Sequence, residues 1–219
     1  MTVLVTGAAG FIGKHLVRSL LEEGQDVVGV DNFITADRRD IEPLLRHDGF
    51  TFIERDITEG PLDDLRGAGK YKAIYNLACP TGVPNLVPLA YEMLATCYDG
   101  SRNVLELARE SNAPVLLTSS AEIYGNPLVS PQTEEYTGNV DTLGVRNGYE
   151  EGKRVAETLF GIYAQKYGVQ AKIVRVFNTY GPGMSLSETR VVPAFVRAAL
   201  SGQSLRIHGD GSQNRCHTF

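Results

Sequence analysis

The sequence predicts an α/β fold in which helices cover both faces of a doubly wound parallel sheet. Two observations at the start of the chain lead to this prediction. A short apolar run at residues 3–5 is followed by a glycine-rich turn, and then by residues 11–21, whose apolar positions recur at helical spacing. A second apolar run ends at a carboxylate, Asp31, about 20 residues further along the chain.

The remaining elements repeat the alternation of strand and helix. Strands are predicted at residues 26–31, 50–54, 72–78, 114–119 and 171–177, with a last short strand at 205–208. Helices are predicted at residues 89–111, 149–167 and 190–200. Strands that alternate with helices at this spacing form parallel sheets covered on both faces, so the chain is expected to be of this class throughout.

The first turn carries the pattern of a Rossmann-type dinucleotide site. Gly7 permits a tight turn, Gly10 lets the backbone approach the phosphates, and Gly13 lets helix and strand pack closely. The N–H groups at the helix start then face the anion. Asp31 is placed to accept hydrogen bonds from ribose hydroxyls and to repel a 2′-phosphate, which favours NAD over NADP. Besides these residues, the predicted NAD contacts are Phe11, Ile12, Asn32, Asp56, Ile57, Leu77 and Ala78.

Composition argues against several other classes of protein. The 219 residues carry a net charge of −5 with both signs interspersed, so no nucleic-acid partner is expected. No apolar run approaches the roughly 18 residues that span a bilayer, so no membrane partner is expected either. Cys79, Cys97 and Cys216 are odd in number and show no paired spacing. We therefore predict no disulfide and no metal site, and a reducing cytoplasm as the location.

Tyr149 and Lys153 indicate proton chemistry. They are four residues apart in a predicted helix and so share a face. A lysine ammonium beside a phenol, with a nicotinamide cation nearby, is expected to lower the phenol pKa, so that Tyr149 acts as a base near neutral pH. The strand at 114–119 places Ser119 and Ser120 at the carboxyl edge of the sheet, where ligands bind. These serines, together with Tyr149 and Lys153, predict an enzyme.

The glycine-rich start, Ser120, Tyr149 and Lys153 resemble the extended short-chain dehydrogenase/reductases, the NAD-dependent epimerase/dehydratase family. The segments 149–157, 177–182, 190–192 and 209–215 are most similar to the UDP-glucuronate decarboxylases (UDP-xylose synthases) in that family. The resemblance implies NAD as cofactor and a UDP-sugar substrate, with UDP-glucuronate favoured. It also implies a homodimer formed by helices 89–111 and 149–167, with Leu105, Ala108, Val155 and Leu159 as candidates for either its interface or the core.

The resemblance further implies a role for each site residue. Tyr149, supported by Lys153, would take the proton from the sugar 4-hydroxyl as C4 is oxidised, and Ser120 would help relay it. Glu122 would orient the carbon that bears the carboxylate, and loss of carbon dioxide followed by re-reduction would give a UDP-pentose. The implied substrate contacts are Cys79, Pro80, Glu122, Asn178, Arg190, Val191 and Arg215.

Two positions depart from the decarboxylase pattern. Ala121 stands where those enzymes carry serine, and Cys97 where the family commonly has asparagine. A 4-epimerase of a UDP-hexose or UDP-hexuronate is therefore an alternative, followed by a 4,6-dehydratase and a non-catalytic NAD-binding regulator. Residues 1–180 are predicted to form the NAD-binding domain. Residues 181–219 are predicted to be only the start of the nucleotide-sugar lobe, because the family continues beyond this region.

Overall fold

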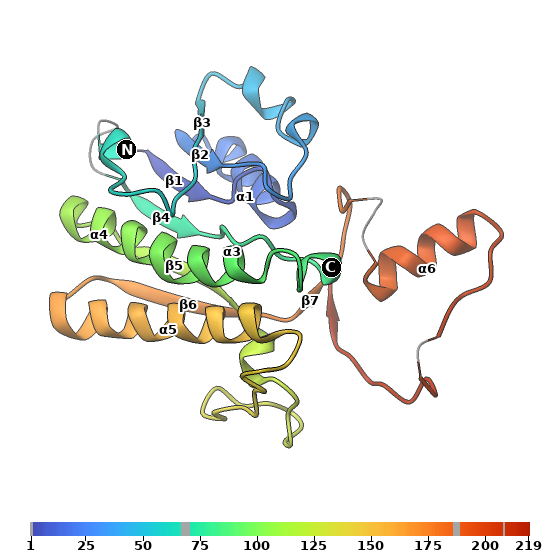
Figure 1. The fold of residues 1–219 in the computed structure, drawn as a ribbon. Helices are drawn as coiled ribbons and strands as arrows, with labels where there is room; N and C mark the ends of the chain where they lie inside the picture. Colours follow the sequence, from blue (N-terminus) through green and yellow to red (C-terminus); the bar gives the residue numbers. More distant parts are fainter. Residues whose placement is uncertain (1, 67–70, 186–188, 208) are drawn as a thin grey trace.

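The computed structural model describes residues 2–66, 71–185, 189–207 and 209–219. Six parallel strands form one sheet in the order β3-β2-β1-β4-β5-β6. The strands are β1 (Val3–Thr6), β2 (Val27–Asp31), β3 (Phe50–Glu54), β4 (Ala73–Asn76), β5 (Val115–Ser120) and β6 (Ala171–Val176). From β1 the chain adds β2 and β3 on one side and then β4, β5 and β6 on the other. The boundary between β1 and β4 is therefore the topological switch point, where open α/β sheets bind ligands. The predicted doubly wound parallel sheet is thus confirmed (Figure 1).

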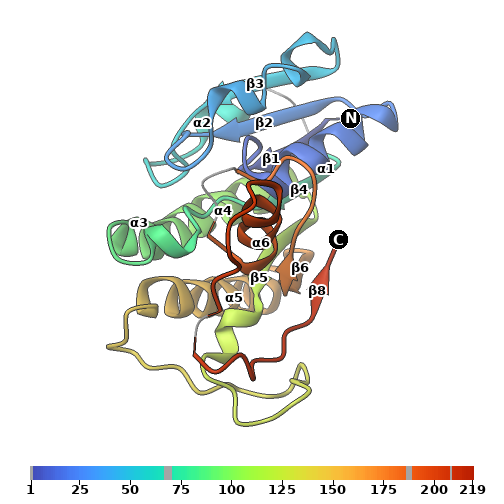
Figure 2. The same cartoon turned by 90° about the vertical axis from the view of Figure 1, so that its right-hand side faces the viewer.

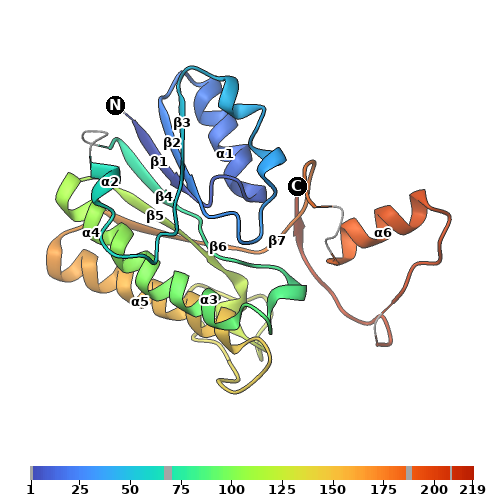
Figure 3. The same cartoon turned by 45° about the horizontal axis from the view of Figure 1, so that its top comes forward.

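Helices cover both faces of this sheet. Helix α1 (Phe11–Glu22) lies on one face, and α4 (Ser101–Ser111) and α5 (Asn147–Tyr167) lie on the other (Figure 3). Adjacent residues of β1 enter opposite cores: Val5 packs in the cluster that includes Val17 of α1, and Leu4 packs in the cluster that includes Phe160 of α5. A strand that is buried on both sides needs this continuous apolar run.

The helix predicted over residues 89–111 is a continuous helical run with an interruption in its hydrogen-bond pattern. It consists of α3 (Ala90–Ala95), a π-helical turn, η4 (Thr96–Gly100), and α4. A Cβ atom added to Gly100 would lie 2.8 Å from Cδ1 of Ile57, so a glycine here lets the helix approach the loop after β3. Single π turns of this kind are frequent at functional sites. Cys97, which lies on this turn, is 2% exposed.

Short elements connect the strands. The described ones are η1 (Arg38–Asp40), η2 (Leu44–Arg46), α2 (Asp63–Arg66), η3 (Val83–Asn85) and η5 (Ala121–Tyr124). The predicted strand at 72–78 is shorter than expected, because the chain leaves the sheet after Asn76. Within the described ranges, no helix has both the length and the hydropathy required to cross a bilayer.

The described residues from 180 to the end, which are 180–185, 189–207 and 209–219 and are here called the C-terminal arm, extend beyond the carboxyl edge of the sheet (Figures 1 and 2). The arm contains α6 (Val191–Leu200), which has no buried residue, and β8 (His217–Thr218), which pairs in parallel with β7 (Asn178–Thr179). The strand predicted at 205–208 is wrong for residues 205–207, which are irregular and exposed, while His208 lies outside the described residues. A strand needs a hydrogen-bonding neighbour, and these residues run apart from the sheet. The domain boundary at residue 180 stays a prediction.

Candidate active site

One large pocket lies at the carboxyl ends of the strands. Its volume is about 1940 Å³, whereas sites for single small ligands span about 300–1,000 Å³. A pocket of this size has room for a dinucleotide together with a second ligand. All predicted cofactor, catalytic and substrate residues line it except Val191, the first residue of α6, which is 42% exposed.

The glycine turn is built for close backbone approach. Gly7 adopts a φ of +68°, and a Cβ atom there would lie 2.8 Å from the backbone nitrogen of Ala78. A Cβ atom at Gly13 would lie 2.0 Å from the carbonyl oxygen of Gly7, so any side chain would force α1 away from the turn. Gly10 precedes α1 without a side-chain cap, and the first turn of the helix has no acidic residue. This open helix start fits a diphosphate.

Asp31 joins the end of β2 to the glycine turn. Its carboxylate accepts hydrogen bonds from the backbone N–H groups of Ala9, at 3.0 Å, and Phe33, at 2.9 Å. Burial raises the pKa of Asp31 despite these hydrogen bonds. Nearby, Arg38 lies 4.4 Å from the ring centre of Phe33 and pairs with Glu54, a strand-end carboxylate. Asp31 lines the pocket, whereas Arg38 does not and is paired with a carboxylate, so this end of the pocket fits NAD better than NADP.

The loop after β3 has a fixed shape at the predicted adenine end. Asp56 accepts a hydrogen bond from Asn32 at 2.8 Å and from the backbone and hydroxyl of Thr58 at 2.8 and 2.7 Å. Burial alone would raise the pKa of Asp56, but these hydrogen bonds lower it. Ile57 is buried, and its carbonyl oxygen accepts a hydrogen bond from Asn103 of α4 at 2.9 Å.

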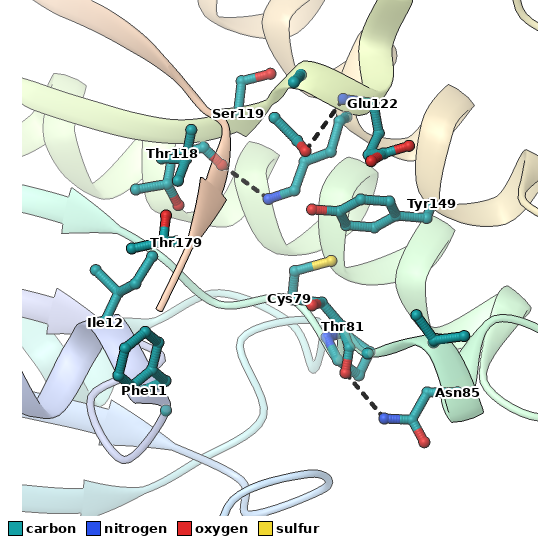
Figure 4. Close-up of a pocket in the computed structure, with 18 of the residues that line it drawn as sticks. Phe11, Ile12, Cys79, Thr81, Asn85, Thr118, Ser119, Glu122, Tyr149 and Thr179 are labelled. Atoms are coloured by element: carbon teal, nitrogen blue, oxygen red, sulfur yellow. Dashed lines mark hydrogen bonds between the residues drawn. The ribbon is translucent and has the colours of Figure 1, made fainter. Parts of the chain in front are cut away.

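Lys153 follows Tyr149 by one turn of α5 and is 4% exposed, while the Tyr149 phenol lies between Glu122 and Cys79 in the view of Figure 4. Its Nζ donates a hydrogen bond to the carbonyl oxygen of Thr118, at 2.8 Å, and lies 6.0 Å from the Tyr149 ring centre. Burial alone would lower the pKa of Lys153. Attraction to the thiols of Cys79 and Cys97 and to the Tyr149 phenol outweighs that effect and raises the pKa.

The pKa of Tyr149 in the chain by itself is set mainly by burial. Burial is the largest influence and raises it above the ordinary value, while Lys153 and a hydrogen bond with Ser120 act in the opposite direction. The sequence expectation included a nicotinamide cation beside the phenol, so a lowered pKa in the NAD-bound state stays a prediction. In the chain by itself the effect of burial, which the sequence does not show, exceeds that of Lys153.

Arg146 was missed by sequence reasoning. Glu122, whose N–H donates to the Ser120 hydroxyl at 3.2 Å, pairs through its carboxylate with Arg146. Arg146 also donates to Glu150 at 3.0 Å, and burial raises the pKa of Glu150. The spacing of Arg146 and Glu150, four residues apart at a helix start, was the available signal, but the contact with Glu122 spans 24 residues.

The predicted substrate contacts come from two parts of the chain. Cys79 and Pro80 follow β4, and the sulfur of Cys79 lies close to Tyr149 (Figure 4). Asn178, Arg190 and Arg215 line the pocket from β7 and the C-terminal arm. Asn178 donates to the carbonyl oxygen of Cys216 at 3.2 Å, which ties β7 to the arm. Among the described residues, no three His, Cys, Asp or Glu side chains are grouped as metal ligands.

Comparison with known proteins agrees with this geometry. The model of the NAD dependent epimerase/dehydratase family matches residues 3–219. The chain is 42% identical over 225 residues to UDP-glucuronic acid decarboxylase 6 of Arabidopsis thaliana, covering 100% of this chain and 62% of that protein. It is 40% identical over 217 residues to UDP-glucuronic acid decarboxylase 1 of Xenopus tropicalis, covering 99% and 50% respectively.

Solved structures show the same fold. UDP-glucose 4-epimerase from Thermotoga maritima, with UDP-glucose, superposes with a TM-score of 0.88 at 27% identity and covers 99% of this chain and 69% of that one. UDP-glucuronic acid 4-epimerase from Bacillus cereus, in complex with UDP-glucuronic acid and NAD, superposes with a TM-score of 0.85 at 28% identity, covering 100% and 69%.

The chain spans 50–62% of the length of these two decarboxylases. The resemblance drawn from the glycine turn, Ser120, Tyr149 and Lys153 is confirmed, and with it NAD as the cofactor and an enzyme as the class of protein. The chain belongs to the NAD dependent epimerase/dehydratase family.

Proposed function

We propose that this chain carries the sugar-oxidising site of a UDP-glucuronate decarboxylase. The observation that carries the proposal is the position of a carboxylate, Glu122, and a guanidinium, Arg146, in the same pocket as Tyr149 and Lys153. An enzyme that only oxidises and reduces a sugar carbon needs Tyr149 and Lys153 but has no need of Glu122 and Arg146. The names of the relatives, at 40–42% identity over the whole chain, support the same activity.

The residues of the chain handle protons in this scheme. Bound NAD supplies the reversible oxidation of the sugar at C4. Tyr149, in the phenolate form, accepts the proton of the sugar 4-hydroxyl, and Ser120 holds that hydroxyl in place. Lys153, fixed by the carbonyl of Thr118, stabilises the negative charge on the phenolate. The same groups return the proton when the carbonyl is reduced.

Glu122 and Arg146 act at the carboxylate of the sugar. Oxidation at C4 leaves a ketone β to the C5 carboxylate, so the electrons of the breaking bond enter an enolate as carbon dioxide leaves. Glu122 orients the carbon that bears the carboxylate and assists its reprotonation. Arg146 forms ion pairs with both Glu122 and Glu150. Its positive charge reduces the repulsion between these two acidic side chains and a substrate carboxylate.

A 4-epimerase is the second candidate. Ala121 is the observation that favours it, because the residue before Glu122 has no hydroxyl with which to hold a substrate carboxylate. The Bacillus cereus neighbour acts as a UDP-glucuronic acid 4-epimerase on a similar fold. Such an enzyme would use Tyr149 and Lys153 in the same way and retain the carboxylate.

We also propose a homodimer through the helices at 89–111 and 149–167 that the resemblance implied, but through other side chains than Leu105 and Ala108. Leu105 and Ala108 belong to the core, at 0% and 1% exposed. Exposed apolar residues of these helices include Tyr91, Leu94, Tyr98 and Ile162. The first three recur at helical spacing along α3 and η4, which forms one face suited to pairing with a second copy.

We retain the cytoplasm as the proposed location. The support is that Cys79, Cys97 and Cys216 are all free thiols in the structure. Cysteines that remain unpaired are typical of proteins in a reducing compartment. The test is to isolate the protein from its own cells and to measure which of its cysteines are reduced.

The test of the activity is to incubate the chain with NAD and UDP-glucuronate and to follow the nucleotide sugar by mass spectrometry. We expect a product lighter by one carbon dioxide, and no product from Tyr149→Phe. A product of unchanged mass and altered retention time would establish the epimerase. Binding of both ligands by calorimetry without any product would favour the non-catalytic regulator.

A further inference from the structure

Cys79 and Cys97 meet in the wall of the pocket, beside Lys153. Their Sγ atoms lie 3.8 Å apart, although the residues are 18 positions apart in the chain. We propose that these two thiols form an oxidation site, in which a peroxide converts them reversibly into a disulfide. This proposal concerns the chemistry of the thiols and does not depend on the sugar that the enzyme uses.

The backbone brings the two sulfurs together from separate elements. Cys79 lies in the loop after β4, and Cys97 lies on the π-helical turn η4. On the other side of Cys97, a Cβ atom at Gly152 of α5 would lie 3.3 Å from both Cβ and Sγ of Cys97. The glycine therefore leaves the space that the sulfur of Cys97 occupies next to Lys153.

The two thiols have different access to solvent. Cys79 is partly exposed and lines the pocket, whereas Cys97 is 2% exposed and is not among the residues that line it. A small oxidant that enters the pocket therefore reaches Cys79 first. Cys97 lies within van der Waals distance behind it, in the position of a resolving thiol.

The pKa values of the two thiols also indicate that Cys79 is the thiol that attacks and Cys97 the one that resolves. A hydrogen bond from Cys97 and the nearby Lys153 ammonium lower the pKa of the Cys79 thiol to about 7, against the effect of burial. The hydrogen bond to Cys79 and burial raise the pKa of Cys97. Because the thiolate is the reactive form of cysteine, Cys79 is the thiol that attacks.

The chemistry balances in two steps. The Cys79 thiolate attacks one oxygen of hydrogen peroxide, so that an S–O bond forms, the O–O bond breaks, and hydroxide leaves with a sulfenic acid on Cys79. Cys97 then attacks this sulfur, so that the S–S bond forms and water leaves. Both sulfurs are oxidised by one electron each and the peroxide is reduced. A dithiol reductant reverses the reaction by exchange.

The disulfide would change the pocket in two ways. It removes the thiolate that faces Lys153, and it ties the loop that contains Ala78, a predicted NAD contact, to the helix that carries η4. Conversely, NAD bound beside Tyr149 and Lys153 covers the route by which a peroxide reaches Cys79. The rate of oxidation should therefore fall several-fold when NAD is bound.

The experiment is to treat the reduced chain with about one equivalent of hydrogen peroxide, alkylate the remaining thiols, and map the peptides without reduction. We expect a linked pair of peptides that contain Cys79 and Cys97, and their release by dithiothreitol. Cys216→Ser is the matched control, since it removes the exposed third thiol and should leave the link unchanged. Cys97→Asn should stop the reaction at a Cys79 sulfenic acid that dimedone captures.

Three results would overturn the proposal. One is oxidation of Cys216 while Cys79 and Cys97 both remain open to alkylation. Another is a disulfide that includes Cys216. The third is an oxidation rate of Cys79 that saturating NAD leaves unchanged. The peptide mapping and the comparison with NAD both use the unmodified chain, so their result stands even where Cys97→Asn fails to fold. It is also independent of whether the chain decarboxylates any sugar.

Discussion

Lys153 carries a buried ammonium that interacts with several acidic groups. The phenol of Tyr149 and the thiols of Cys79 and Cys97 all interact with it. Burial raises the pKa of Tyr149, whereas that of Cys79 falls to about 7, so near neutral pH the thiolate of Cys79 is the anion that forms first beside Lys153. The phenolate needed for proton transfer must then be favoured by another positive charge, and the nicotinamide cation is the one expected there.

This leads to a prediction about the pH dependence of cofactor binding. If the nicotinamide cation lowers the pKa of Tyr149, binding releases a proton, and by linkage NAD must bind more tightly as the pH rises toward the pKa of the free chain. That window lies above neutral pH and extends beyond the ordinary tyrosine value of about 10. Calorimetry at several pH values should show the rise. Tyr149→Phe should abolish its upper part, and an identical profile for the variant would contradict the assignment.

We predict that Asp31 sets the choice between NAD and NADP. Asp31→Asn keeps an oxygen that can accept a hydrogen bond from the N–H of Ala9 or Phe33, but removes the charge that repels a 2′-phosphate. We expect the ratio of NADP to NAD affinity to rise by about tenfold or more, as measured by titration with each cofactor. Asp26→Asn, with the same change of charge just before β2 and outside the pocket, serves as the control. A ratio that stays constant in both variants would be evidence against this role.

At the scale of the element, α5 positions the site because its first turns approach α3 closely. A Cβ atom at Gly148 would lie 2.5 Å from the carbonyl oxygen of Ala90, whereas one at Gly161, further along the helix, would meet nothing within 4 Å. Lys153 and Tyr149 depend on this approach, since both follow Gly148 within two turns of the helix.

The two glycines give a matched pair of stability predictions. Gly148→Ala should lower the free energy of unfolding by about 1–3 kcal/mol, because backbone atoms must move apart. Gly161→Ala should raise it by about 0.5–1 kcal/mol, because alanine restricts the unfolded chain and favours helix. Denaturant unfolding measures both. Equal effects of the two substitutions would show that α5 does not rest on α3 as described.

The elements also show what the sequence could predict and what it could not. Residues 3–5 and 11–21 were predicted from local periodicity, and the structure extends them by one residue each, to Thr6 and Glu22. The strand expected at 205–208 is wrong for the described residues 205–207, because an apolar run forms a strand only when another strand is available to pair with it. The π turn at Cys97 was not predicted, since nothing in a single helix period distinguishes it from an ordinary turn.

The candidate site also contains residues that the sequence predicts and contacts that it does not. Gly7, Gly13 and Asp31 could be predicted to lie together, and they do line one pocket, because their spacing follows from the local geometry of one strand, turn and helix. Arg146 and the contact between Cys79 and Cys97 were missed, because each depends on how separate elements pack. The raised pKa of Tyr149 was missed for a related reason: burial is a property of the folded chain.

At the scale of the whole molecule, the pocket is shared between the sheet and the C-terminal arm. The sheet contributes the glycine turn, Asp31 and the Tyr149 region, and the arm contributes Arg190 and Arg215. The relatives are longer than this chain, which covers half of one and 62% of another. The apolar face formed by Tyr91, Leu94 and Tyr98 lies on the surface of the molecule.

The proposed dimer makes this face testable. Tyr91→Glu combined with Tyr98→Glu places two charges on the predicted contact surface, where burial without partners is costly. We expect the dimer to dissociate in analytical ultracentrifugation at micromolar concentration, with the fold retained by circular dichroism. Leu200→Glu on α6, which is similarly exposed at 85%, is the control and should not change the mass. A dimer that survives the double substitution would place the interface elsewhere.

The most direct test of the account uses UDP-glucuronate labelled with deuterium at C4, incubated with the chain and NAD. Oxidation and re-reduction at the same carbon, with loss of the carboxylate in between, predict a UDP-pentose that keeps deuterium at C4, without net conversion of the cofactor. Tyr149→Phe should leave the labelled substrate intact. A labelled hexuronate of inverted configuration at C4 would contradict the decarboxylase and establish the epimerase instead.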